Sequence, residues 1–184
     1  MIVYIIDLVP IIIGMPAGLK QTSSTVSIGF SLPESAANTF TQESVDLNLS
    51  PLDREVFVVL AINLDPQSPD FKSADTFTNC SLTTTSQTAV ATLGDANCMA
   101  VAQQRIQVNA DGEIAGVGFQ QQSLETPPST MDYIGIIATN DFFVQVIGGG
   151  NSNSKGVSGK LYGYRAQATA DIYAALVQSE VLSA

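Results

Sequence analysis

The chain has 184 residues and a mass of 19.3 kDa, enough for one domain with its own core and too little for two ordinary ones. Seven Lys and Arg against 17 Asp and Glu give a net charge of −10, and the charged fraction, 13%, is well below the roughly 25% of an average soluble domain. The absence of His excludes Ser-His-Asp and Cys-His catalytic sets and imidazole metal sites, and the acidic balance argues against direct nucleic-acid binding.

Residues 1–19 read MIVYIIDLVPIIIGMPAGL and are almost wholly apolar. No Lys or Arg precedes Lys20, which is unlike a secretory signal, and Asp7 and Pro10 interrupt the run, which is unlike a membrane span. The β-branched residues favour an extended strand. Three interpretations stay open: an additional strand on the chain's own sheet, an arm docked on a neighbouring subunit, and contact with a lipid layer. We divide the chain into this apolar arm and a domain over residues 20–184.

The arm would contact another copy of the chain through its large apolar side chains. Aromatic residues close to the C-terminus are the other candidates, because an aromatic strand there commonly packs a sandwich or a subunit contact. The predicted subunit-interface residues are Ile2, Val3, Tyr4, Ile5, Ile6, Leu8, Val9, Ile11, Ile12, Ile13, Tyr162, Tyr164 and Tyr173.

After the arm, short apolar runs alternate with turns rich in Gly, Pro, Asn and Asp, which is typical of a β-sandwich or barrel. The clearest run, EVFVVLAINL, is apolar on both faces and predicts a strand covered on both sides. The predicted strands span residues 26–32, 45–49, 55–64, 80–85, 89–93, 99–108, 114–119, 133–139, 142–147 and 160–168.

Residues 171–182 predict a short C-terminal helix, because Ile172, Leu176 and Val177 stand near helical spacing among several Ala; a last strand is the alternative. The expected fold is therefore all-β: a single-domain antiparallel β-sandwich of about 8–10 strands, with an extended N-terminal arm.

Candidate chemical sites are few. Asp65, Asp70 and Asp75 recur around a Pro-rich loop and are either solvated turn acids or Ca²⁺ ligands. Residues 148–160 contain Gly and Lys as a phosphate loop does, but the G-x-x-x-x-G-K-[ST] spacing is missing. Residues 148–156, GGGNSNSKG, predict a flexible turn.

The two cysteines fit no metal spacing. Cys80 and Cys98 are either small buried hydrophobic residues or one disulfide. We predict no catalytic residue, no metal site and no cofactor, and we do not expect an enzyme.

Three segments toward the C-terminus carry a resemblance. Residues 133–139 (YIGIIAT), 160–166 (KLYGYRA) and 173–180 (YAALVQSE) resemble the end of small β-rich viral capsid proteins, and residues 55–65 are similar to a buried capsid strand. The resemblance spans roughly half of the chain without a diagnostic motif. It implies a single jelly roll that self-assembles into an icosahedral shell within a virion.

The N-terminus departs from that family's usual pattern. Small capsid proteins that package naked genomes usually carry a basic arm, whereas this arm is apolar. The departure implies that another virion protein contacts the genome, or that an internal membrane lies between genome and shell. The second arrangement is similar to that of the single-jelly-roll capsid proteins of membrane-containing archaeal and bacterial viruses.

Two other functions compete with a capsid subunit. The first is a non-viral filament or surface-layer subunit at the extracellular surface, in which the N-terminal segment completes a neighbour's sheet by strand addition. The second is a carbohydrate-binding or hydrolytic β-sandwich, which the absence of Trp and His disfavours. Copies of the chain itself are the expected partners in the capsid and filament functions.

Overall fold

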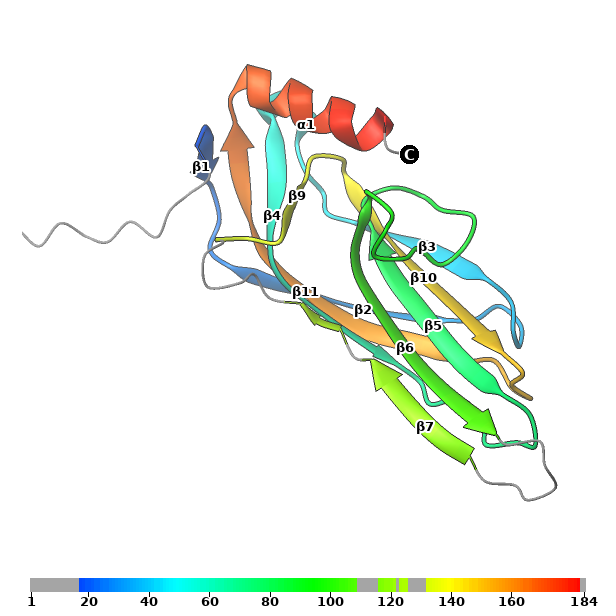
Figure 1. Ribbon diagram of the computed structural model, residues 1–184. Helices are drawn as coiled ribbons and strands as arrows, with labels where there is room; N and C mark the ends of the chain where they lie inside the picture. Colours follow the sequence, from blue (N-terminus) through cyan, green and yellow to red (C-terminus); the bar gives the residue numbers. More distant parts are fainter. Residues whose placement is uncertain (1–16, 109–115, 122, 126–131, 183–184) are drawn as a thin grey trace, which may run out of the picture.

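The computed structural model describes residues 17–108, 116–121, 123–125 and 132–182 (Figure 1). These ranges hold eleven strands, a short 3-10 turn and one helix. The elements are β1 Leu19–Gln21, β2 Val26–Pro33, β3 Thr41–Asp46, η1 Pro51–Asp53, β4 Glu55–Pro66, β5 Thr76–Thr83, β6 Cys98–Val108, β7 Gly116–Gln121, β8 Ser123–Glu125, β9 Gly135–Ile137, β10 Asp141–Gly149, β11 Gly156–Ala168 and α1 Ala170–Leu182.

The strands form two antiparallel sheets. In the first sheet β11 and β4 are central; β1 and β2 pair in succession with the outer edge of β11, and β8 and β9 pair with the outer edge of β4. The second sheet has the order β3-β10-β5-β6-β7. The prediction of an all-β antiparallel sandwich is confirmed, and the predicted helix is present as α1.

The pairing of strands is nested along the chain. The first long strand, β2, pairs with the last, β11; β3 pairs with β10; β4 pairs with β8 and β9; and β5 pairs with β6. Nested pairing of this kind, split between two sheets, is the topology of a jelly roll. β1 and β7 are additions at the edges of this arrangement.

The space between the sheets is filled by the chain's own side chains. Phe57, Ile62, Leu64, Leu82 and Phe142 are among those that are at most 1% exposed there. The ring of Phe142 also meets that of Phe30 edge to face, with the ring centroids 5.6 Å apart. The two sheets are thus held together by a close-packed apolar layer.

β4 is buried on both faces, as its sequence predicts. Phe57 and Val59 face the layer between the sheets, while Val56 and Val58 face a second apolar cluster on the outside of the first sheet. Opposite β11 the register shifts by one residue between Val59 and Ala61, which leaves Leu60 as a β-bulge. Beyond the bulge the inward positions change from odd to even numbers, so that Ile62 continues the inner layer.

Helix α1 covers the second apolar cluster. Ile172, Tyr173, Leu176 and Val177 pack on it, at the spacing of one helix face. The helix begins where β11 ends: the carbonyl of Thr169 accepts the first helical hydrogen bond, from the N–H of Tyr173, at 2.9 Å.

Several predicted boundaries are wrong. The strand expected at residues 45–49 lies at Thr41–Asp46, and the strand expected at 89–93 is not a strand. The last two residues of β7 and all of β8 lie outside every predicted strand. The strand expected at 133–139 is only the three residues of β9. Residues 109–115 lie outside the described residues, but β6 and β7, which correspond to the strands expected at 99–108 and 114–119, do pair.

The cysteines are thiols and do not form the disulfide that the sequence left open. Cys80 on β5 stands opposite Ala102, four residues along β6 from Cys98. Four residues of a strand span about 13 Å, whereas a disulfide joins Cα atoms about 4.4–6.8 Å apart. Burial raises the pKa of the Cys80 thiol to about 12, so that it stays protonated at neutral pH.

Candidate assembly surfaces

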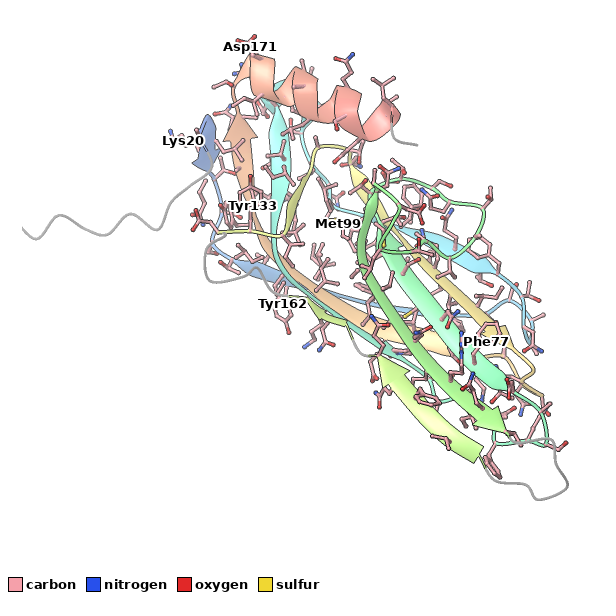
Figure 2. The ribbon with its side chains drawn as sticks, viewed as in Figure 1. Lys20, Phe77, Met99, Tyr133, Tyr162 and Asp171 are labelled. Atoms are coloured by element: carbon pink, nitrogen blue, oxygen red, sulfur yellow. The ribbon has the colours of Figure 1, made fainter. Side chains whose placement is uncertain are left out.

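The predicted arm lies almost entirely outside the described residues, and with it all ten predicted interface residues between Ile2 and Ile13. The described chain starts at the base of the arm. Leu19 is 8% exposed and belongs to the cluster under α1, and Gly18 lies so close to Ile172 that a Cβ would be 2.1 Å from its Cδ1. The arm is therefore attached to the domain at β1, beside the start of α1 (Figure 2).

The three predicted tyrosines lie on β11 and α1. Tyr164 and Tyr173 both belong to the cluster under α1, and Tyr164 is only 9% exposed. Tyr162 is half-buried, also on β11. Burial raises the pKa of Tyr164, with the nearby Asp132 carboxylate as a second cause. Tyr164 thus packs chiefly within its own chain, and a subunit contact of Tyr162 stays a prediction.

The C-terminal part of α1 is attached to the sandwich by a buried carboxylate. Glu180 is 9% exposed, and its two oxygens each accept a 2.9 Å hydrogen bond, from the N–H groups of Ala138 and Thr139. Burial is the largest influence on the pKa of Glu180 and raises it, although these hydrogen bonds oppose the shift and the Asp141 carboxylate adds to it. Sequence reasoning did not identify this residue, because a Glu near a helix end is ordinarily solvated.

The raised pKa of Glu180 predicts a pH dependence of stability. Because the folded chain holds this proton more tightly than the unfolded chain, the stabilisation is complete below the ordinary Glu pKa of 4.5 and is lost as pH rises through the folded pKa. In Glu180→Gln, we expect the free energy of unfolding to fall less steeply with rising pH above 4.5 than in the unmodified chain. Urea unfolding at a series of pH values measures both slopes, and equal slopes would contradict this prediction.

At the end of the molecule opposite α1, the turn between β10 and β11 is held by a network of hydrogen bonds. The side chain of Asn151 accepts from the N–H of Asp70 at 2.9 Å and donates to the carbonyl of Phe77 at 2.9 Å. Glu34, 5% exposed, accepts from the N–H groups of Gly148 and Lys155. The turn predicted to be flexible is therefore firmly attached to three neighbouring segments.

The acidic loop residues do not gather into a metal site. Asp70 accepts from Lys155 Nζ at 2.6 Å and from the N–H of Ser152 at 2.7 Å, and the lysine is the main cause of its lowered pKa. Asp75 accepts from the N–H of Val108 at 2.9 Å. Within the described ranges no three His, Cys, Asp or Glu residues stand where they could hold a metal ion. Ca²⁺ binding by this loop thus has no support in the part of the chain that is described.

The outer face of the second sheet is partly covered by residues 84–97. Gln145, fully buried on β10, donates to Thr83 Oγ1 at 2.7 Å and accepts from Ser81 Oγ at 2.8 Å. Ser81 Oγ in turn accepts from the N–H of Ala91 at 3.0 Å. The segment predicted as the strand at 89–93 thus crosses over the sheet and is fixed by polar side chains, whereas a strand would pair with a neighbour through its backbone.

β7 differs from the other strands because all six of its residues are exposed. It pairs with β6 on one side, and within the described residues no strand pairs with its other side. Val117 is 59% and Phe119 55% exposed. Phe119 and Arg105 line a shallow groove of about 300 Å³ on the outer face. An uncharged sheet edge with exposed Val and Phe side chains is a surface that proteins ordinarily cover.

Comparison with known proteins gave little. No protein-family model matches the chain, and no curated protein matches it. Among solved structures, a chain described as Desmodium yellow mottle tymovirus is similar over 85% of this chain and 95% of its own length, with 10% sequence identity and a TM-score of 0.27. A likeness this distant carries no argument about function.

Among the described residues, no helix is long and apolar enough to cross a membrane. The one helix there, α1, has 13 residues, whereas a span needs about 20.

Proposed function

We propose that the chain is a structural subunit of a virus capsid that self-assembles into an icosahedral shell and resides in the virion. The observation that carries the proposal is the jelly-roll pairing of a sandwich whose interior is filled by its own side chains. Capsid, lectin and cupin domains share this architecture. Lectins and cupins use it to hold a ligand or a metal, whereas a shell subunit needs a rigid block with outward-facing contacts.

Several groups that could do chemistry in the described chain have structural tasks, which favours a structural function over an enzyme. The Asp70 carboxylate pairs with Lys155, the Glu180 carboxylate attaches α1, and the Cys80 thiol is buried and protonated. Apolar groups, in contrast, are exposed at β7, and the sequence of the arm is rich in them. Association by apolar burial is the mechanism that this distribution supports.

Copies of the chain are the principal partners in this proposal. Net charge −10 disfavours direct contact with a nucleic acid, so other virion proteins or an internal membrane would lie between shell and genome. The apolar arm, which has Asp7 as its one charged residue before Lys20, suits contact with a neighbouring subunit or with the inner side of the shell.

A second candidate is an extracellular filament or surface-layer subunit. The open edge of β7 favours it specifically, because a strand supplied by the next subunit can continue that sheet. Head-to-tail contacts of this kind close into rings or shells only if the rotation between subunits permits it, and otherwise form filaments.

Electron microscopy of the assembled protein, with the particle mass, tests the proposal. We expect closed particles of icosahedral symmetry whose mass is a multiple of the 19.3 kDa chain. Open helical filaments would favour the second candidate and overturn the first. A monomer at all concentrations would overturn both.

A further inference from the structure

We propose that the open edge of β7 is the docking site for the N-terminal arm of another copy of the chain, which adds as a further strand to the second sheet. This inference depends on the proposed self-assembly but not on the shape of the final particle. It places the arm on one edge among the several that a sandwich presents.

Exposure separates β7 from the other edges. β3, at the opposite edge of the same sheet, carries the charged residues Glu43 and Asp46, which protect an edge from pairing. β2 has no charge, but its large side chains Ile28 and Phe30 pack against the inner layer. Only β7, among the strands whose side chains are described, is exposed at every residue, and it has neither a charge nor a Pro.

The two faces of β7 are unequal. Val117 and Phe119 point to the outer face, in register with Gln107 and Arg105 of β6. On the other face stands Gly118, and a Cβ built on it would meet nothing within 4 Å. This face therefore has room for a large side chain from an added strand, in the way that aromatic residues cover glycines at sheet edges.

The arm has the complementary pattern. Its first nine residues, MIVYIIDLV, are apolar except for Asp7 and end before Pro10, and they match the six residues of β7 with some to spare. Side chains alternate along a strand, so Tyr4 beside Gly118 would place Ile5 and Asp7 on the outer face. A second β7 paired symmetrically about Gly118 would be a poorer occupant, because a glycine facing a glycine leaves this space empty.

The geometry favours docking of the arm on another copy of the chain over docking on its own β7. The arm leaves the domain at β1, beside α1, whereas β7 lies at the far end of the molecule from α1 (Figure 1). Strand addition of this kind uses backbone hydrogen bonds for affinity and side-chain pockets for specificity, which suits an arm with little charge.

Cross-linking in the full-length chain tests the docking site. The variant Tyr4→Cys, Gly118→Cys also carries Cys98→Ser, which removes the more accessible of the two native thiols. Cys80 can stay, because its buried thiol is unreactive at neutral pH. Isotope-labelled and unlabelled copies are mixed before assembly and treated with a short bismaleimide, because directly opposite residues on paired strands have Cβ atoms about 4.5–5.5 Å apart. Digestion and mass spectrometry then identify the linked peptides.

The expected result is a peptide joining positions 4 and 118 in which one half is labelled and the other is not. The matched control carries Gly29→Cys in place of Gly118→Cys. Gly29 lies on the edge strand β2 and also has open space around it. This control should give no cross-link above background. Equal yields at the two positions, no link at 118, or links only within one copy would each overturn the inference.

A second measurement does not require cysteines. Phe119→Glu introduces a charge on the proposed docking edge, and sedimentation should show loss of the assembled particle. Leu52→Glu, at a side chain 96% exposed in η1, is the control and should assemble normally. Normal assembly of Phe119→Glu would contradict the inference.

The outcomes also separate this inference from the proposed function. Filaments that show the hybrid 4–118 peptide would support the docking site and refute the capsid. Closed shells without that peptide would support the capsid and refute the docking site.

Discussion

Removing residues 1–16 is expected to yield a folded monomer, lighter than the 19.3 kDa chain, that no longer assembles. The deletion spares Gly18 and Leu19, whose contacts with α1 and β11 attach the start of the domain. It removes most of the large apolar side chains that the proposal assigns to subunit contacts, and each would contribute about 1.5–3 kcal/mol on full burial. Sedimentation velocity measures assembly, and urea unfolding shows whether the shortened chain retains a cooperative transition.

A longer deletion is the control for the boundary. Removing residues 1–21 also removes β1 with the buried Leu19, so we expect this chain to be measurably less stable than the 1–16 deletion. Normal assembly without residues 1–16 would contradict the assignment of the arm to subunit contacts. Failure of that chain to fold would show instead that the segment belongs to its own core.

Leu82→Ala is expected to lower the free energy of unfolding by about 2–5 kcal/mol. Leu82 is fully buried between the sheets, and its loss leaves a cavity that a close-packed layer cannot readily close. A domain of this size has a total stability of about 5–15 kcal/mol, so this variant would lose a large part of it. Urea unfolding of Leu82→Ala and of the unmodified chain, with the two transitions fitted together, gives the difference in the free energy of unfolding.

Leu52→Ala is the matched control, since it makes the same change at a side chain that is 96% exposed in η1. We expect it to change the free energy of unfolding by no more than about 0.5 kcal/mol in either direction. Equal costs at the two positions would contradict a filled interior. They would also reopen the possibility that the sandwich encloses a ligand, which is the main rival to a structural function.

The sequence predicted burial better than it predicted pairing. Val45, Leu47 and Leu49 alternate, and Leu47 and Leu49 are indeed buried, but the strand ends at Asp46. The N–H of Asn48 donates to the Asp46 side chain at 2.7 Å, and Asn48 has a positive φ of 52°. A side chain is buried wherever the backbone turns it toward the core. A strand also needs a neighbouring strand that pairs with it in register.

Parts of the candidate surfaces could be predicted from sequence and parts could not. The apolar arm is visible as a run of Ile, Val and Leu without basic residues, and Ile114 to Phe119 was expected to form a strand, most of which is β7. The exposure of β7 could not be predicted, because it follows from the position of the strand at the end of the second sheet. Glu180 was missed for a similar reason, since its N–H partners come from a segment about 40 residues earlier.

The sequence by itself determined most of the extended segments and the strand that is buried on both faces, and it favoured a helix over a last strand at residues 171–182. Alternation, β-branched residues and turn residues are local properties, so they can be recognised without knowing the neighbours. Only the tertiary structure decided the nested pairing of β2 with β11 and β3 with β10, the burial of Glu180, and the open edge of β7. These features depend on contacts between residues far apart in the chain, and one sequence contains no direct record of which distant strands meet.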